Sequence, residues 1–270
     1  MIRKLTTSAV DAGTPLAAWL SSRLGVSEEE ARRRVEAGSV YLDGRRAHDP
    51  GTVLRAGQRL AVHQAAEASV ASWRVAFEDA EVLAIDKPEG LPVTADRAGG
   101  RALDVEVAAR WPGATLLHRI DRDTSGLVLF ARGSAARKRL HAALETGRIH
   151  RFYAAVVAVA PERDDLRLDA TVGPDPADAR RMRAGVSGGK PALSLVHVER
   201  RAADRALLTV ELVTGRTHQI RVHLAAAGHP ILGDRIYGGP PAPRLLLHAR
   251  RLTWPGGRAE SPLPEEMSQL

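Results

Sequence analysis

The sequence predicts an α+β protein, in which a small α+β module precedes a larger domain built on a mixed, mostly antiparallel sheet flanked by helices. From Trp73 onward, strand-like runs outnumber helical segments and do not alternate strictly with them. Residues 14–63 show the pattern of two helices followed by a small sheet. The stretch 64–72 is small, polar and without a period, which is typical of a linker. A length of 270 residues with 44% hydrophobic residues suffices to bury a sizeable core.

Two helices open the module. Thr14 and Pro15 are suited to begin the first, and the apolar residues that follow share one helical face. Ser27 and Glu30 form the S-x-x-E pattern of a capping box at the start of the second. This second helix is expected to run to about residue 37, with Gly38 as its C-terminal stop.

A small sheet follows these helices. Residues 40–45 predict a short strand that runs into an Asp-Gly turn. Residues 54–62 predict a turn and a closing strand. We therefore expect the module at residues 1–66 and the linker at 67–72.

The larger domain is expected at residues 73–258, before a C-terminal tail at 259–270. It contains no internal repeat at solenoid or propeller spacing. Strands are predicted at 82–85, 127–131, 153–159, 193–198 and 207–213. Helices are predicted near 103–110, 135–146 and 217–227.

Charge and cysteine content narrow the functional classes. A net charge of +7 and a pI near 10.4 favour a polyanionic partner such as nucleic acid, although an arginine-rich proteome gives the same excess. The absence of cysteine excludes disulfides and a cysteine nucleophile. No signal peptide is evident, and no apolar run approaches the roughly 18 residues of a membrane span. We expect a soluble, cytoplasmic protein, monomeric by default.

The segment 118–131 carries the sharpest candidate for chemistry. Asp121 stands between Arg119 and Arg122, just ahead of an apolar strand. A nearby guanidinium favours the ionised form of a carboxylate, and an ionised carboxylate can act as a nucleophile. On spacing alone, a structural role for Asp121 in a surface salt bridge or a turn cap is favoured over a role as nucleophile.

This segment resembles the signature of the RluA-type pseudouridine synthase family, H-R-L-D-x-x-T-S-G-L-L-L-F-A. It differs only at Ile120 and Val128, and both replacements are apolar. The resemblance extends over roughly residues 73–256. Further segments that match in the family's order are 82–93 with its K-P-x-G turn, 151–155, 214–224, 228–234 and 246–249.

Residues 14–63 resemble a second family, the alpha-L RNA-binding module named after a small-subunit ribosomal protein (S-four-like). The segments 38–44 and 56–58 stand where that module has G-x-V-x-V-N-G and A-G-D. Asp43 replaces the usual Asn, and Gln58 replaces the usual Asp. Many RluA-type enzymes carry this module at the N-terminus.

These resemblances imply the pseudouridine synthase fold and an isomerase that acts on RNA. The family's conserved aspartate, here Asp121, attacks the target uridine, and the glycosidic bond breaks. The uracil is turned within the site and rejoined to the ribose through carbon 5. No cofactor and no metal is implied.

The resemblance also assigns supporting roles. Arg221 would pair with the catalytic carboxylate, and Tyr153 would stack on the uracil and move a proton late in the reaction. Arg119 would fill the space that the flipped uridine leaves. Residues expected to bind RNA are Arg119, Arg122, Arg216, His218, Arg32 and Arg33, and those expected to line the substrate pocket are Leu246 and Ile220.

Other patterns carry less weight. Residues 185–189 match G-x-S-x-G but lack the strand-turn-helix context of a hydrolase. His218 and His223 do not have metalloprotease spacing, so we expect no metal site. Large-subunit ribosomal RNA is the favoured substrate and transfer RNA the alternative. A catalytically silent RNA-binding protein of the same fold is a further alternative, although Asp121, Tyr153 and Arg221 are all present.

Overall fold

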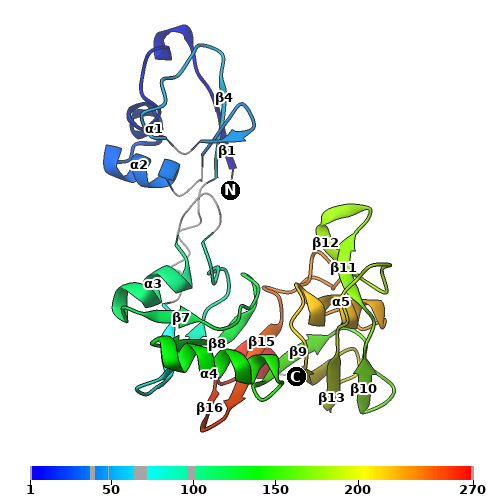
Figure 1. Ribbon diagram of the computed structural model, residues 1–270. Coiled ribbons are helices and arrows are strands. Elements are labelled where there is room, and N and C mark those ends of the chain that lie inside the picture. Colours follow the sequence, from blue (N-terminus) through cyan, green and yellow to red (C-terminus); the bar gives the residue numbers. More distant parts are fainter. Residues whose placement is uncertain (1, 37–39, 48, 64–71, 96–100, 269–270) are drawn as a thin grey trace. The chain divides into compact units, whose positions relative to one another are not determined.

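The computed structural model describes residues 2–36, 40–47, 49–63, 72–95 and 101–268 (Figure 1). Its contacts divide the chain into two compact units. The first comprises Met1–Ala71 with Thr94–Glu106, and the second comprises Ser72–Val93 with Val107–Leu270. In the parts of the chain that the structure describes, no helix combines the length and the apolar character needed to span a membrane.

The N-terminal part of the first unit contains the two predicted helices, α1 (Leu16–Leu24) and α2 (Glu28–Glu36). A 3-10 turn, Ala9–Asp11, precedes them. The Glu30 amide donates to Ser27 Oγ at 3.2 Å, so the serine caps α2 as the sequence indicates. The expected end of this helix at residues 37–38 lies outside the described residues.

The sheet of this unit has the strand order β1-β4-β2-β3. Asp43 (φ 49°) and Gly44 (φ 80°) both have positive φ, as a type I′ hairpin turn requires. The sheet and both helices enclose one apolar cluster that includes Trp19, Leu20 and Leu60. The strand bounds are Ile2–Thr6 for β1, Val40–Leu42 for β2, Arg45–Arg46 for β3 and Arg59–His63 for β4.

A ten-stranded sheet forms the second unit, with the order β10-β13-β14-β9-β15-β8-β6-β5. β16 pairs with β15, and β7 pairs with β8. Among the described strand pairs only β8 and β15 run parallel, which confirms the predicted mixed, mostly antiparallel sheet. The bounds are β5 Arg74–Glu78, β6 Val82–Lys87, β7 Ala114–Leu116, β8 Ser125–Arg132, β9 His150–Val157, β10 Asp165–Leu168, β13 Ser194–Arg201, β14 Ala206–Leu212, β15 Leu247–Trp254 and β16 Gly257–Glu260.

Helices and one hairpin complete this unit (Figure 1). α4 (Ser134–Glu145) packs Ala136, Leu140 and Ala143 into the apolar cluster that also contains β8 residues. α5 (Gln219–Ala226) contributes to a separate cluster with the hairpin of β11 (Val172–Asp175) and β12 (Asp178–Ala184). The short helix α6 (Glu265–Ser268) also belongs to this unit, whereas α3 (Leu103–Arg110) begins in the first unit and ends in the second.

The parallel pairing of β8 and β15 depends on Gly126. Its φ is 105°, and a Cβ atom there would meet the carbonyl oxygen of Ala249 at 2.3 Å. We expect Gly126→Ala to lower the free energy of unfolding by at least about 2 kcal/mol, because strain and overpacking add. Urea unfolding measures the loss.

A matched control for this substitution is Gly147→Ala. Gly147 also has positive φ (70°), but no atom lies within 4 Å of a Cβ built there. This control is expected to lower the free energy of unfolding by only about 1 kcal/mol, the cost of a left-handed backbone conformation for alanine. Equal losses in the two variants would contradict the role given to close strand approach.

Candidate active site

Segments far apart in the sequence line one cavity in the second unit. Asp121 lies in the loop between β7 and β8, Tyr153 lies on β9, and Arg221 lies in the first turn of α5. Arg119, Arg216, His218 and Ile220 line the same cavity, so it gathers most of the predicted site residues.

A bidentate ion pair sets the position of Arg221. Its Nε and Nη2 donate to the two carboxylate oxygens of Asp234 at 2.7 and 2.8 Å. The Asp234 side chain is fully buried and also accepts the backbone N–H groups of Ile236 and Tyr237. Paired planar groups of this kind fix orientation as well as charge.

The remaining Arg221 nitrogen faces Asp121. Nη1 donates to Asp121 Oδ2 at 3.3 Å. Burial alone would lower the pKa of the Arg221 guanidinium, but hydrogen bonds and charge from Asp234 and Asp121 raise it above its ordinary value. The Asp121 side chain keeps 26% of its surface exposed, so a cation bridges a buried anion and an accessible one.

Tyr153 forms an aromatic wall of the cavity. The residue is 4% exposed, and burial raises the pKa of its phenol to about 12, against the opposing charge of Arg151. The phenol is therefore neutral at physiological pH. A neutral ring beside Asp121 is suited to stack on a base.

Leu247, the first residue of β15, provides an apolar wall. The predicted pocket residue Leu246 is buried but does not line this cavity. Successive side chains of an extended chain point to opposite faces, so an offset of one residue exchanges the two. Ile220, the other residue predicted to line the substrate pocket, is one of the residues around this cavity.

His218 is held in a left-handed conformation (φ 55°) just before α5. Its Nδ1 lies 2.8 Å from the Tyr237 hydroxyl, whose oxygen accepts the Met182 N–H. The second ring nitrogen, Nε2, lies 3.9 Å from Asp121 Oδ2, so the His218 ring links Tyr237 to the Asp121 side of the cavity. Burial lowers the pKa of His218, against the opposing charge of Asp121.

The predicted basic residues fall into different surroundings. Arg119 is exposed at the cavity, and Arg216 Nε donates to the Pro191 carbonyl at 3.0 Å. Arg122 points elsewhere: its Nε donates to the Gly90 carbonyl at 3.0 Å, and it does not line the Asp121 cavity.

Arg32 and Arg33 lie on α2 in the first unit. Arg33 pairs with Glu29 and Glu30 at 2.8 and 2.9 Å, whereas the Arg32–Glu28 distance is 3.9 Å. Both arginines remain more than half exposed. Surface pairs of this kind contribute little to stability and leave the guanidinium groups accessible.

Several residues of the site were not assigned roles from the sequence. Asp234 ends the matching segment 228–234 and Tyr237 lies beyond it, and nothing in the spacing indicates that they contact Arg221 and His218. Thr124, Leu212 and Gln219 also line the cavity. Within the described ranges, no group of three or more His, Cys, Asp or Glu residues is arranged to hold a metal ion.

The fold and the cavity define an RNA-modifying enzyme of the pseudouridine synthase class, and comparison with known proteins agrees. Residues 81–226 match the RNA pseudouridylate synthase family, and residues 14–60 match the S4 domain. The chain belongs to the RNA pseudouridylate synthase family and, within it, to the RluA type. It is an isomerase that acts on RNA.

The chain is similar to several bacterial proteins. An uncharacterised RNA pseudouridine synthase of Zymomonas mobilis is 37% identical over 73% of this chain and 96% of its own length. Ribosomal large subunit pseudouridine synthase D of Pseudomonas aeruginosa is 33% identical over 87% of this chain and 84% of its own. The structure of human RNA pseudouridylate synthase domain containing 1 has a similar fold, with a TM-score of 0.62, 24% identity and coverage of 73% and 84%.

Proposed function

We propose that this chain converts specific uridines of large-subunit ribosomal RNA to pseudouridine, with Asp121 as the nucleophile. The observation that carries the catalytic part is the fixed contact of Arg221 with Asp121 beside the neutral Tyr153 ring. The names of relatives such as the Pseudomonas aeruginosa enzyme favour ribosomal RNA over transfer RNA. A monomeric state and a cytoplasmic location stay predictions from the sequence.

The chemistry follows from this arrangement. The Asp121 carboxylate attacks C1′ of the flipped uridine and forms an ester bond there as the bond between N1 of uracil and C1′ breaks. The uracil turns while Tyr153 and Leu247 hold its faces, and a bond forms between C5 and C1′ as the ester bond breaks and frees the Asp121 carboxylate. The hydrogen on C5 is then lost to water and N1 takes up a proton, so that product and substrate have the same composition.

Arg221 acts by positioning. Because Asp234 holds two of its nitrogens, the guanidinium presents a fixed donor to Asp121 throughout the reaction. Pre-organised charge of this kind costs no rearrangement at the moment of attack. Arg119, exposed at the mouth of the cavity, is placed to stack in the gap that the flipped base leaves.

Nucleoside analysis tests the function. Transcripts of large-subunit ribosomal RNA and of transfer RNA would be incubated with the protein, digested and separated, since pseudouridine and uridine differ in retention but not in mass. We expect pseudouridine from the ribosomal transcripts. Product from transfer RNA alone would reassign the substrate, and binding without product would favour a silent RNA-binding protein.

We further propose that residues 1–66 form an RNA-binding module that contributes affinity through phosphate contacts of α2. The double variant Arg32→Ala, Arg33→Ala is expected to reduce the slope of log affinity against log salt by about 1–2, because each phosphate contact contributes about 0.7–0.9. Fluorescence anisotropy at several salt concentrations measures the slope.

The matched control for this prediction is Arg137→Ala, Lys138→Ala. These two residues are also adjacent, basic and exposed, and they lie on α4. The control is expected to leave the slope unchanged. Identical slopes for the α2 variant and the wild type would contradict phosphate binding by this helix.

A further inference from the structure

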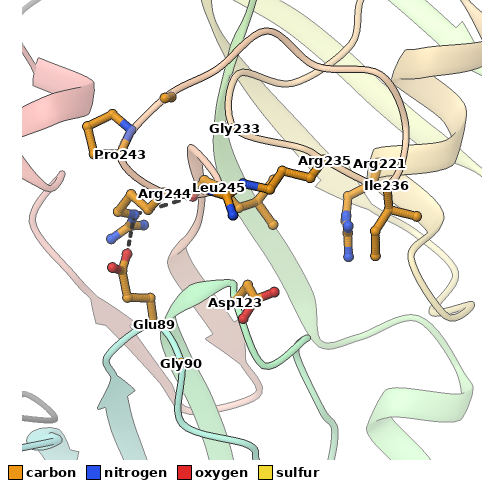
Figure 2. A pocket seen from close by; sticks show the side chains of 11 residues that line it. Glu89, Gly90, Asp123, Arg221, Gly233, Arg235, Ile236, Pro243, Arg244 and Leu245 are labelled. Carbon is orange, nitrogen blue, oxygen red and sulfur yellow. Dashed lines mark hydrogen bonds and ion pairs between the residues drawn. The ribbon is translucent and has the colours of Figure 1, made fainter. Parts of the chain in front are cut away.

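A second cavity of about 300 Å³ shares Arg221 with the cavity that contains Asp121 (Figure 2). Its polar lining includes Glu89, Asp123, Arg235 and Arg244, and its apolar lining includes Ile236 and Pro243. The chemistry proposed above uses none of these side chains. The size falls at the lower end of the range typical of ligand pockets, about 300–1,000 Å³.

One wall of this cavity is formed by Arg244, which an ion pair and a hydrogen bond hold in place. Arg244 Nε lies 2.5 Å from Glu89 Oε2, and its Nη2 donates to Ser125 Oγ at 2.6 Å. The Arg244 side chain is only 10% exposed. A Cβ atom on Gly233 would lie 1.8 Å from the Arg244 carbonyl oxygen, so only glycine allows the backbone to approach Arg244 this closely.

The other side of the cavity is open to a ligand. Arg235 is exposed, and no ion pair or side-chain hydrogen bond is found for it within the described part of the chain. Figure 2 shows its side chain extending over the space above Asp123. Ile236, beside it, is 38% exposed and adds an apolar surface to this side of the cavity.

The balance of charge indicates the class of ligand. Arg221 is committed to Asp234 and Asp121, so two guanidinium groups, Arg235 and Arg244, face the carboxylates of Glu89 and Asp123. A lining without net charge favours a neutral ligand over a phosphate anion. Donors and acceptors beside apolar surfaces suit a nucleobase, whose edge offers both kinds of group and whose faces stack.

We propose that this cavity binds an unpaired base of the same RNA strand as the target uridine and thereby sets the sequence context that is modified. The inference rests on the proposed function, because the shared Arg221 places the two occupants next to each other. Arg235 and Ile236 contact the second base, and Arg244 with Glu89 forms the edge that reads it.

This subsite can be tested by combining a protein substitution with changes in the RNA and asking whether their effects on affinity are independent. Synthetic hairpins from the large-subunit ribosomal RNA fragment that the wild type binds would carry an abasic nucleotide at each flanking position in turn. We expect one position to cost the wild type about tenfold in affinity, as loss of one stacked base does. Arg235→Ala should lose a similar factor with intact RNA and little more with that abasic RNA.

The control Arg258→Ala removes an exposed arginine of β16 that lines neither cavity. It should show no coupling to any abasic position. The proposal would be overturned if the loss of affinity caused by Arg235→Ala multiplied with the loss caused by the abasic nucleotide at every position. A reduced slope of log affinity against log salt for Arg235→Ala would then indicate a phosphate contact. Pseudouridine formation at saturating RNA is measured separately, so failure of the proposed function shows as absent product while the coupling is still readable.

Discussion

Replacement of Asp121 by asparagine is expected to lower the rate of pseudouridine formation by about 10⁴-fold or more, because the amide cannot act as the nucleophile. The substitution preserves shape. Arg221 keeps its two hydrogen bonds to Asp234, and Asp121 is partly exposed, so stability should change by less than about 1 kcal/mol. RNA affinity should stay within a few-fold of the wild type.

Three measurements on one preparation separate these expectations. Product formation at saturating RNA reports the chemical step, anisotropy reports RNA affinity, and thermal unfolding reports the fold. A variant that retains near-normal turnover would remove Asp121 from the role of nucleophile. A variant that unfolds would make the loss uninformative, and Asp121→Ala and Asp121→Ser then serve in its place.

Arg221→Met is expected to lose both activity and stability. The substitution leaves the fully buried Asp234 carboxylate without its cation, and breaking a buried pair from one side costs about 3–5 kcal/mol. It also removes the donor to Asp121. Urea unfolding and product formation should therefore both change, in contrast to Asp121→Asn.

The double variant Arg221→Met, Asp234→Asn distinguishes the two effects of this arginine. Neutralising Asp234 removes the buried unpaired charge, so much of the stability should return. Activity should not return, because Asp121 still lacks its donor. A double variant with restored activity would show that Arg221 serves only to balance Asp234.

Much of the fold could be predicted because most of its long strands are largely apolar, while β13 alternates buried and exposed residues. β6, β8, β9, β13 and β14 all fall on predicted segments. By contrast, β12 has the sequence DARRMRA, whose charged residues hide any alternation. Strand β1 was missed for another reason: it is defined by pairing with β4, more than 50 residues away, rather than by a local pattern.

The candidate site also combines residues that local sequence motifs predict with residues that no local pattern indicates. Asp121, Tyr153 and Arg221 stand in motifs that the sequence displays, and the structure brings them to one cavity. Asp234 holds Arg221 through a contact between a helix and a loop, which no local pattern encodes. Leu247, and not the predicted Leu246, lines the cavity, because strand register fixes which face each side chain occupies.

Release of tritium from RNA labelled on carbon 5 of uridine tests the central claim most directly, since forming the bond from C5 to ribose must expel that hydrogen into water. Large-subunit ribosomal transcripts would be incubated with the wild type and with Asp121→Ala. We predict release by the wild type and none by the variant. Equal release by both would contradict the role of Asp121, and binding without release by the wild type would contradict the assigned reaction on this RNA.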